Sequence, residues 1–391
     1  MKKILTILAL CSLLQAKTEL VVSYAYAWFK PLHEKLKEEF EKQNPDISIT
    51  FLAPTQNYEE QSARLLREKV INKLPDVSFN SYAYLPTLVD KNIPHELHPS
   101  NAQDFGEGIK TTTLGGKIYA LPFAISMPVT YYNEDLIRQA GWVGELPKTW
   151  DEIFALCEKV NGLEGKSCMY FAETDTWLIL ALALQRGGAL LNAQNKADFS
   201  TPAWLDTFKI LSEFHSRAKM PSVKKSEALT SFNAGNLALL VQTSAALVQT
   251  EKAVNFTLKL GKFPQVKEGG KLPVGGSLVM LTSDKNKEAA LKYIDFVTGW
   301  GNQFVPQFTG YMSVNSKAHA QLGEFYAQNP NAKVAPSQLP LLVEWPSFPG
   351  NNALKATNIL WLSAEKLLLG KSTDYEGVAR KATEDINRIL P

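Results

Sequence analysis

The sequence predicts an α/β fold made of two sets of strands and helices. Residues 18–91 alternate between strand and helix three times, which is typical of a parallel or mixed sheet covered by helices. A second α/β set follows in residues 151–242. The chain has 391 residues, of which 45% are hydrophobic and 20% charged, so it can build two or three ordinary domains or two large lobes.

The first set is recognised by short β-rich runs and one strongly amphipathic helix. Leu32, Leu36 and Phe40 recur at helical spacing behind Pro31 and predict a helix that ends at Asn44. Strands are expected over residues 18–23, 47–52 and 77–79, and further helices over residues 58–74 and 84–91.

Residues 115–141 predict two strands followed by a short helix. Residues 117–122 and 127–132 are apolar and rich in β-branched and aromatic side chains. Pro122 and Pro128 exclude a helix there, and Asn133 can cap a helix that ends at Gly141.

The second set opens at Thr149, which forms a capping box with Glu152. Helices are expected over residues 151–160, 177–186, 202–219 and 227–233, and strands over residues 167–171 and 237–242. A strand at 277–281, a helix at 287–298 and two closing helices at 351–369 and 374–390 complete the chain.

The N-terminus has the pattern of a secretory signal peptide. Lys2 and Lys3 precede an apolar run at residues 4–14, and cleavage is expected after Ala16. A buried first strand is the alternative, but the basic start favours export to the periplasm. A lipid anchor on Cys11 is disfavoured because Leu10 stands where a small residue is needed.

Charge and cysteine content narrow the class of protein further. Loss of Lys2 and Lys3 lowers Lys+Arg from 41 to 39, which equals the 39 Asp+Glu, so nucleic-acid binding is not expected. Cys157 and Cys168 remain after cleavage, and in an exported protein they either form a disulfide or stay as buried thiols. No His or further Cys stands at metal-ligand spacing from them.

Several segments resemble the solute-binding proteins of bacterial ABC importers, family 1, and most closely the glycerol-3-phosphate-binding branch of these maltose-binding-like proteins. They are residues 57–59, 128–135, 243–244, 275–277, 309–311 and 370–371. The resemblance implies a two-lobed periplasmic binding protein fold with three interlobe crossings, the third at residues 309–315. It places residues 17–125 and 277–312 in lobe 1, and residues 126–276 and 313–391 in lobe 2.

The same resemblance implies a monomer that binds a small molecule between its lobes and delivers it to an ABC permease in the membrane. It places Tyr58, Ser126, Ser244, Gly276 and Tyr311 in the ligand cleft. Hydroxyl groups and the exposed N–H of a glycine can bind the hydroxyls of a ligand or a phosphate. Ordinary hydrogen bonding at strand ends is the alternative role for the two serines.

Aromatic residues follow the expected strands and extend this site. Tyr82, Trp177 and Trp345 are expected to line the cleft, and Tyr24, Tyr26, Trp28 and Tyr84 also follow strand ends. Aromatic faces stack on sugars and attract quaternary ammonium groups. Packing in a core is the alternative role for each of these rings.

The chain departs from the family branch at two ligand positions. It has no acidic residue in residues 80–84, where the branch binds glycerol hydroxyls, and no arginine in residues 345–350, where the branch binds phosphate. Lys355 is the nearest cation that follows. A neutral saccharide or a glycerophosphodiester is therefore expected to bind better than glycerol-3-phosphate.

No catalytic or cofactor motif is present, so the protein is not expected to be an enzyme or to hold a cofactor. The five histidines stand among polar residues and are expected to be solvated: His33, His95, His98, His215 and His319. Two alternatives remain open, an exported carbohydrate-active hydrolase and a ferric-ion-binding protein. The second would use Tyr131 and Tyr132, although neighbouring strand residues point to opposite faces.

Overall fold

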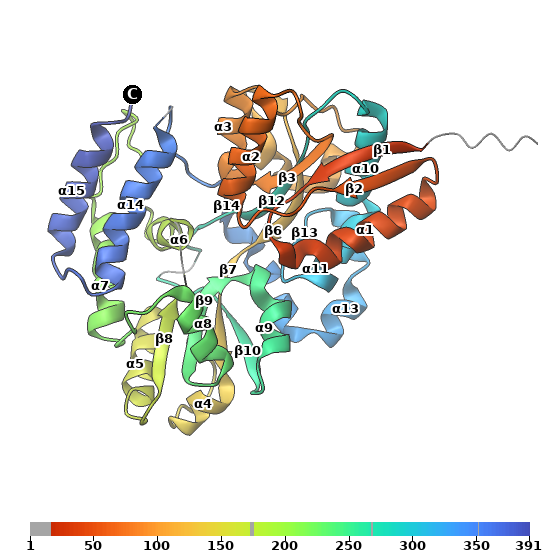
Figure 1. The fold of residues 1–391 in the computed structure, drawn as a ribbon. Helices are drawn as coiled ribbons and strands as arrows, with labels where there is room; N and C mark the ends of the chain where they lie inside the picture. Colours follow the sequence, from red (N-terminus) through yellow and green to blue (C-terminus); the bar gives the residue numbers. More distant parts are fainter. Residues whose placement is uncertain (1–16, 173–175, 267–268, 351) are drawn as a thin grey trace, which may run out of the picture.

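The computed structural model describes residues 17–172, 176–266, 269–350 and 352–391, which form two lobes around two main sheets (Figure 1). The predicted signal peptide and Cys11 lie outside the described residues. The larger sheet has the order β13-β6-β12-β3-β1-β2 and the smaller sheet the order β10-β7-β9-β8. The two-lobed α/β fold was predicted from the sequence.

The strands of the larger sheet are β1 (Thr18–Ser23), β2 (Ile47–Phe51), β3 (Val77–Ser81), β6 (Leu121–Ser126), β12 (Gly275–Leu281) and β13 (Met312–Ser313). β1 runs parallel to β2 and β3, whereas β12 runs antiparallel to β3 and β6, and β13 antiparallel to β6. Because β12 is buried on both faces, its alternate side chains enter two different cores. Leu278 and Met280 pack in the core that contains Leu65, and Val279 and Leu281 in the core that contains Leu36.

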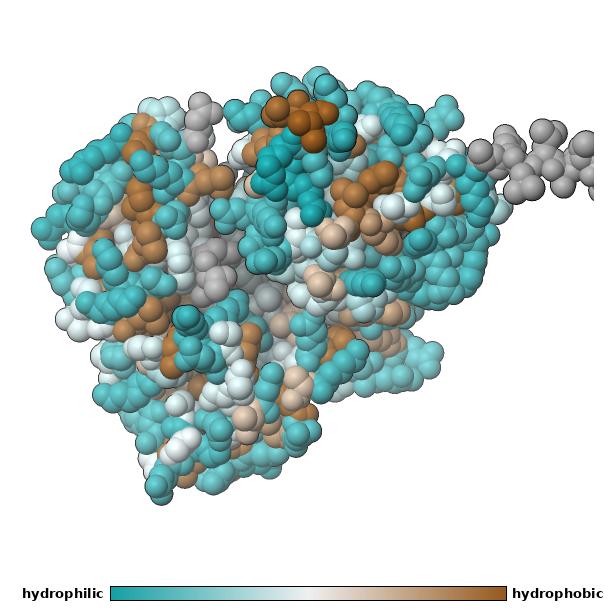
Figure 2. Space-filling model, in the orientation of Figure 1, coloured by the Kyte–Doolittle hydropathy of each residue, from teal (hydrophilic) through white to brown (hydrophobic). Residues whose placement is uncertain are grey.

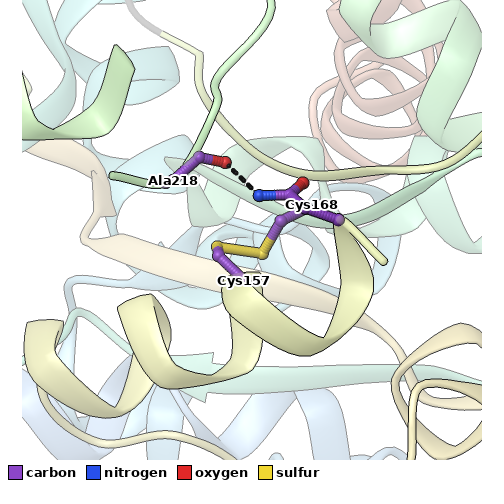
Figure 3. Close-up of a disulfide and its surroundings, with 4 residues drawn as sticks. Cys157, Cys168 and Ala218 are labelled. Atoms are coloured by element: carbon purple, nitrogen blue, oxygen red, sulfur yellow. Dashed lines mark hydrogen bonds between the residues drawn. A yellow bond between two sulfur atoms is a disulfide. The ribbon is translucent and has the colours of Figure 1, made fainter. Parts of the chain in front are cut away.

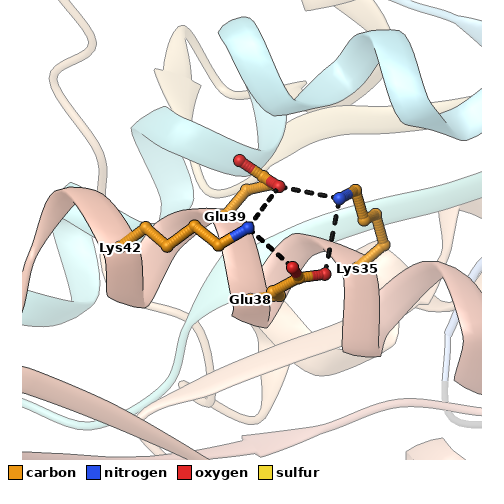
Figure 4. A network of polar contacts seen from close by, with 4 residues as sticks. All are labelled: Lys35, Glu38, Glu39 and Lys42. Atoms are coloured by element: carbon orange, nitrogen blue, oxygen red, sulfur yellow. Dashed lines mark hydrogen bonds and ion pairs between the residues drawn. The ribbon is translucent and has the colours of Figure 1, made fainter.

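Helices cover both faces of this sheet (Figure 1). They are α1 (Lys30–Gln43), α2 (Tyr58–Val70), α3 (Leu85–Asp90), α10 (Lys287–Thr298), α11 (Phe304–Phe308) and α12 (Ser316–Ala320), with the 3-10 helices η1 (Ala27–Phe29), η2 (Tyr82–Tyr84), η3 (Ala102–Thr112) and η5 (Trp300–Gln303). The outer face of α1 carries a network of four charged side chains (Figure 4). Lys35 and Lys42 lie 2.7 and 3.1 Å from Glu39 and also contact Glu38. Because Lys35 and Glu39 are partly buried while Glu38 and Lys42 are exposed, these surface pairs add little to stability.

The strand expected at residues 117–122 is two strands in the structure. Gly115 and Gly116, with φ of 57° and 78°, turn β4 (Thr113–Leu114) into β5 (Lys117–Ile118). β6 then begins separately at Leu121 and continues to Ser126. Its pairing with β12 shifts register between Ser277 and Leu278, opposite Pro122, which has no N–H to donate.

The smaller sheet contains β7 (Pro128–Asn133), β8 (Ser167–Phe171), β9 (Leu237–Thr243) and β10 (Leu258–Lys262). β8 is parallel to β9, while β7 is antiparallel to β9 and β10. β10 was not predicted from the sequence. The side-chain amide of Asn331 accepts from the Leu260 N–H at 3.0 Å and donates to the Leu258 carbonyl at 3.2 Å, so it protects the outer edge of this strand.

The helices of the second lobe are α4 (Glu134–Gln139), α5 (Trp150–Val160), α6 (Trp177–Gln185), α7 (Pro202–Ser216), α8 (Lys225–Asn233), α9 (Leu247–Ala253), α14 (Ala353–Leu368) and α15 (Tyr375–Asn387), with the 3-10 helix η4 (Ser244–Ala246). α7, α14 and α15 pack on one another at one end of the molecule (Figure 1). α6 is apolar on all sides and lies buried beside them, as expected for a helix enclosed by its neighbours.

A disulfide joins α5 to β8 (Figure 3). Cys157 and Cys168 have Cα atoms 5.0 Å apart, and both side chains are fully buried. One turn after Cys157, the side-chain amide of Asn161 donates to the Ala218 carbonyl at 2.9 Å. The disulfide that the sequence analysis left open is therefore present in the structure.

The chain passes between the sheets three times. It leaves β6 at Ser126 and enters β7 at Pro128, and it leaves β11 (Leu272–Pro273), which pairs with β14 (Leu342–Val343), to enter β12 at Gly275. The third passage follows α12, which contacts η3 and η5, and passes α13 (Gly323–Gln328) to reach η6 (Pro330–Lys333) beside β10 and then η7 (Pro336–Leu341).

The three passages differ in detail from the boundaries expected from the sequence. Ser126, Gly276 and Ser313, which the sequence analysis assigned to lobe 2, lie in strands of the larger sheet, because pairing with neighbouring strands continues through these residues. The third passage begins after residue 320 rather than at residues 309–315. No helix in the described ranges is long and apolar enough to cross a membrane.

Candidate functional site

The topology brings five of the expected ligand residues to one edge of the larger sheet. The C-terminal ends of β3 and β6 lie at this edge, and the antiparallel β12 begins there, since Gly275 pairs with Ser126 and Ser277 with Ser81. Open α/β sheets bind ligands at such an edge. The five residues are Tyr58, Tyr82, Ser126, Gly276 and Tyr311.

Tyr58 is the first residue of α2. Asn57 caps this helix by accepting from the Glu60 N–H at 2.8 Å. The Tyr58 hydroxyl lies 3.4 Å from the Tyr311 hydroxyl, so two segments far apart in the sequence meet at this point. Burial raises the pKa of both phenols well above the ordinary value, and the nearby Tyr26 adds to the increase. Both groups are therefore neutral hydrogen-bonding groups at physiological pH.

A buried polar network holds the start of α2 against the sheet. The Gln61 amide donates to the hydroxyls of Ser23 at 2.8 Å and Ser78 at 3.0 Å. Asn80 donates to the Ser62 hydroxyl at 3.0 Å, and Ser62 donates to the Tyr58 carbonyl at 2.9 Å. Buried polar groups are costly unless they are paired, so this network favours one placement of Tyr58. This network was not predicted from the sequence, although Ser23, Ser78 and Asn80 are polar residues in expected strands or next to them.

Aromatic rings surround the two hydroxyls. The Trp28 ring is stacked near Tyr311 at 5.9 Å between centroids, and the Tyr26 ring meets Tyr58 edge to face at 5.0 Å. Both Tyr26 and Trp28 are half-buried. Tyr24, which the sequence analysis also considered, is instead buried 4.1 Å from His33 in the core.

Gly275 and Gly276 allow a close approach of the chain at the same edge. A Cβ atom on Gly276 would lie 2.1 Å from the Ala124 carbonyl oxygen, and its φ of +123° is one that other residues avoid. A Cβ atom on Gly275 would meet the Trp177 ring at 2.5 Å and the Ser126 hydroxyl at 2.6 Å. The second lobe therefore contacts the first at Gly275.

Ser244 lies at the matching edge of the smaller sheet, directly after β9. Its hydroxyl accepts from the Met127 N–H at 3.2 Å, and its side chain is fully buried. A Cβ atom on Gly310 would lie 1.8 Å from the Ser244 carbonyl oxygen, and the Gly310 N–H donates to the Ala245 carbonyl at 3.2 Å. In this conformation Ser244 contacts both the first passage between the lobes, at Met127, and the segment that precedes β13, at Gly310.

Trp177 begins α6 and faces the second passage between the lobes. Its indole N–H donates to the Pro273 carbonyl at 3.1 Å, and its ring is stacked 6.2 Å from Trp345 with an angle of 21° between the planes. Only 6% of Trp177 is exposed, whereas Trp345 is half-buried. Trp177 thus supports Trp345, which has the more accessible ring.

The eight expected residues fall into two groups, one on each side of the boundary between the lobes. Figure 2 shows a hollow between the part formed by α7, α14 and α15 and the part formed by α1, α2 and α3. None of the eight side chains carries a charge. A separate concavity of about 700 Å³ lies along the outer edge of β10, and its lining includes none of the eight.

Tyr131, Tyr132 and His33 are all buried in the structure. Tyr131 and Tyr132 are fully buried and donate to different backbone carbonyls, those of Thr243 at 2.9 Å and Pro147 at 3.0 Å, and burial raises both pKa values. Both hydroxyls are therefore engaged in hydrogen bonds to the backbone inside the core. The expectation that His33 is solvated was wrong, because it lies on the inner face of α1 with 1% of its surface exposed. Within the described part of the chain, no three His, Cys, Asp or Glu side chains are grouped to hold a metal ion.

Two α/β lobes, three connections and facing uncharged edges define a protein that binds a solute between its lobes. The chain belongs to the bacterial extracellular solute-binding protein family, whose sequence profile matches residues 35–334. It is 24% identical to the sn-glycerol-3-phosphate-binding periplasmic protein UgpB of Escherichia coli, over 91% of this chain and 89% of that protein. The protein is thus an extracytoplasmic solute-binding protein of the ABC importer class, as the sequence predicted.

Solved structures have the same fold. The GacH receptor of Streptomyces glaucescens, solved unliganded and with acarbose, superposes with a TM-score of 0.82 at 17% identity over 96% of this chain and 100% of that chain. UgpB of Mycobacterium tuberculosis, solved with glycerophosphocholine, gives a TM-score of 0.81 at 20% identity over 95% of this chain and 98% of that chain.

Proposed function

We propose that this protein captures a neutral saccharide or a glycerophosphodiester between its lobes and delivers it to an ABC permease. The observation that carries the proposal is the placement of eight uncharged residues in two groups, one on each side of the boundary between the lobes. Hydroxyls from Tyr58 and Tyr311 suit hydrogen bonds to ligand hydroxyls, while Trp345 offers a ring for stacking. The acarbose and glycerophosphocholine complexes of the two similar structures agree with this ligand class.

We further propose that the protein acts as a periplasmic monomer after cleavage near Ala16. Lobe 1 then comprises residues 17–126 and 275–320, and lobe 2 residues 128–273 and 330–391, with short connections between them. The membership of β6, β12 and β13 in one sheet supports these limits. Ligand that contacts both lobes would favour a closed arrangement, which the permease could recognise. Catalysis is not part of the proposal, because the family and the similar proteins bind solutes.

Native mass spectrometry of gently purified protein tests the proposal directly. A retained saccharide or glycerophosphodiester at one copy per chain is the expected result. A retained metal ion, or turnover of a glycoside by the purified protein, would contradict it and favour one of the two alternative classes.

A further inference from the structure

We propose that Tyr26 is a ligand-contacting residue, held beside the Tyr58–Tyr311 pair by a strained backbone. The inference rests on the proposed function and adds a residue that no resemblance assigned to the site. The ligand feature it would meet is a face of C–H groups with partial positive charge, which both a pyranose ring and a trimethylammonium group present.

The backbone of Tyr26 adopts a conformation that bulky residues avoid. Its φ is 65° and its ψ is 113°, outside even the left-handed helical region. In the described part of the chain, the other non-glycine residues with positive φ are three asparagines, which tolerate it, and Lys219 just beyond a helix. Strain of this kind persists only where the surroundings impose it, and it is concentrated at functional sites.

Hydrogen bonds on both sides of Tyr26 impose the conformation. The Tyr26 N–H donates to the Thr55 carbonyl at 2.7 Å, and the Thr55 N–H donates to the Tyr24 carbonyl at 3.3 Å, which extends the pairing of β1 with β2. The Phe29 N–H then donates to the Tyr26 carbonyl at 3.1 Å and starts η1. The chain must therefore turn at residue 26, where a glycine would be the ordinary choice.

The backbone conformation favours glycine at position 26, so the side chain is the reason that a tyrosine stands there. The ring meets Tyr58 edge to face at 5.0 Å and lies 5.6 Å from Trp28, and it remains half-buried. Tyr26 also adds to the increase in the pKa of Tyr58 and Tyr311, which burial mainly causes. A ring needed only for core packing would be enclosed, as Tyr24 is with 2% of its surface exposed.

The strain is tested first, without ligand, by comparing Tyr26→Gly with Tyr26→Ala. Both remove the ring, but only alanine keeps the Cβ atom that makes the backbone unfavourable. Tyr26→Gly is expected to melt roughly 1–3 °C above Tyr26→Ala, the reverse of the usual order. Asn195→Gly is the matched control, because Asn195 has φ 55° on an exposed turn far along the chain from this site. An alanine variant that melts at or above the glycine variant would overturn the strain argument.

Ligand contact is tested by titration calorimetry with maltose and with sn-glycero-3-phosphocholine. For whichever probe the wild type binds, Tyr26→Gly and Tyr26→Ala are expected to bind roughly tenfold more weakly or worse, while Tyr26→Phe and Asn195→Gly stay within about threefold. Wild-type affinity in the glycine and alanine variants would overturn the role of Tyr26 alone. A wild type that binds neither probe would overturn the proposed ligand class, and with it this role, whereas the melting comparison would still report on the strain.

Discussion

The hydroxyl oxygens of Tyr58 and Tyr311 lie 3.4 Å apart, although 253 positions separate the two residues in the sequence. One belongs to the first turn of α2 and the other precedes β13, so their contact joins these two elements at one edge of the larger sheet. Burial raises the pKa of each, and both phenols are protonated in the folded protein at neutral pH.

This burial predicts a loss of stability at alkaline pH. A phenol whose pKa is raised on folding is ionised more readily in the unfolded chain, so its contribution is complete below pH 10 and is lost as pH rises above that value. Denaturant unfolding at pH 8–11 should show this fall, and it should become shallower in the Tyr58→Phe/Tyr311→Phe double variant. An unchanged slope in that variant would mean that other buried phenols, and not Tyr58 and Tyr311, cause the loss of stability at alkaline pH. Tyr375→Phe, a change at a partly exposed position on α15, is the control.

The buried histidine predicts a second pH effect, in the acidic range. His33 packs 4.1 Å from the Tyr24 ring and 4.7 Å from the Phe79 ring, and burial lowers its pKa to about 3. The unfolded chain takes up a proton near pH 6.5 while the folded chain does not, so stability falls as pH drops from 6.5 towards 3, by at most about 1.4 kcal/mol per pH unit.

The variant His33→Phe should remove that part of the acid sensitivity, because the position already lies among aromatic rings. Urea unfolding at a series of pH values between 4 and 7 measures the slope. His98→Gln, at an exposed position, serves as the control and should leave the slope unchanged. Equal slopes for wild type and His33→Phe would show that His33 does not titrate as its burial implies.

The histidine also illustrates where sequence reasoning fails. Leu32, Leu36 and Phe40 predicted the inner face of α1 correctly, but His33 is as buried as they are because the wide apolar face of this helix also includes its neighbour in the sequence. Periodicity likewise predicted β1, β3, β9 and the closing helices to within a few residues. β10 was missed because its run Leu258–Lys262 alternates around two lysines and a glycine and lies on an edge.

The candidate site, too, was predicted only in part from the sequence. Resemblance and strand-end aromatics indicated eight residues, which lie in two groups, one on each side of the boundary between the lobes, and their role in binding stays a prediction. The polar network of Gln61 and Asn80, and the strained turn at Tyr26, depend on pairings between segments that no local pattern reveals. Burial was equally hidden, since Trp177 and Ser244 proved to be enclosed at the lobe connections.

The disulfide should stabilise the second lobe. Cys157 and Cys168 close a short loop between α5 and β8, for which the chain-entropy model gives about 2–3 kcal/mol. The Cys157→Ala/Cys168→Ala double variant should therefore unfold at lower denaturant concentration with an unchanged slope. Intact mass after alkylation without reductant should show no modified thiol at these positions in the wild type. Two alkylated thiols under denaturing conditions would contradict the bond.

Trp177 should affect binding and stability together. Its indole hydrogen bond to Pro273 and its contact with Gly275 connect α6 to the second passage between the lobes, and it supports the ring of Trp345. Trp177→Ala should weaken ligand binding by roughly 1–3 kcal/mol. Trp345→Ala is the informative comparison, because it removes the more exposed ring and leaves the Pro273 contact in place. Unchanged affinity in both variants would remove this aromatic pair from the site.

The last prediction concerns the charge of the ligand. A terminal phosphate monoester carries nearly two negative charges, and a site that excludes water must neutralise them or leave a costly buried charge. None of the eight candidate residues is a cation, and the segment 345–350 contains no arginine for a bidentate contact. Lys355, in the first turn of α14, is exposed. A neutral saccharide needs no counter-charge, and a phosphodiester carries only one negative charge.

We therefore expect a saccharide or a glycerophosphodiester to bind more tightly than glycerol-3-phosphate, with the saccharide slightly favoured. Titration calorimetry with maltose, sn-glycero-3-phosphocholine and glycerol-3-phosphate at one pH and two salt concentrations measures the order. Binding of the neutral sugar should be insensitive to salt, whereas any binding of the monoester should weaken as salt rises. Lys355→Gln should affect only the phosphate-containing ligands. Tightest binding to glycerol-3-phosphate would mean that another cation replaces the absent arginine, and the loss of affinity in Lys355→Gln would then show whether Lys355 supplies it.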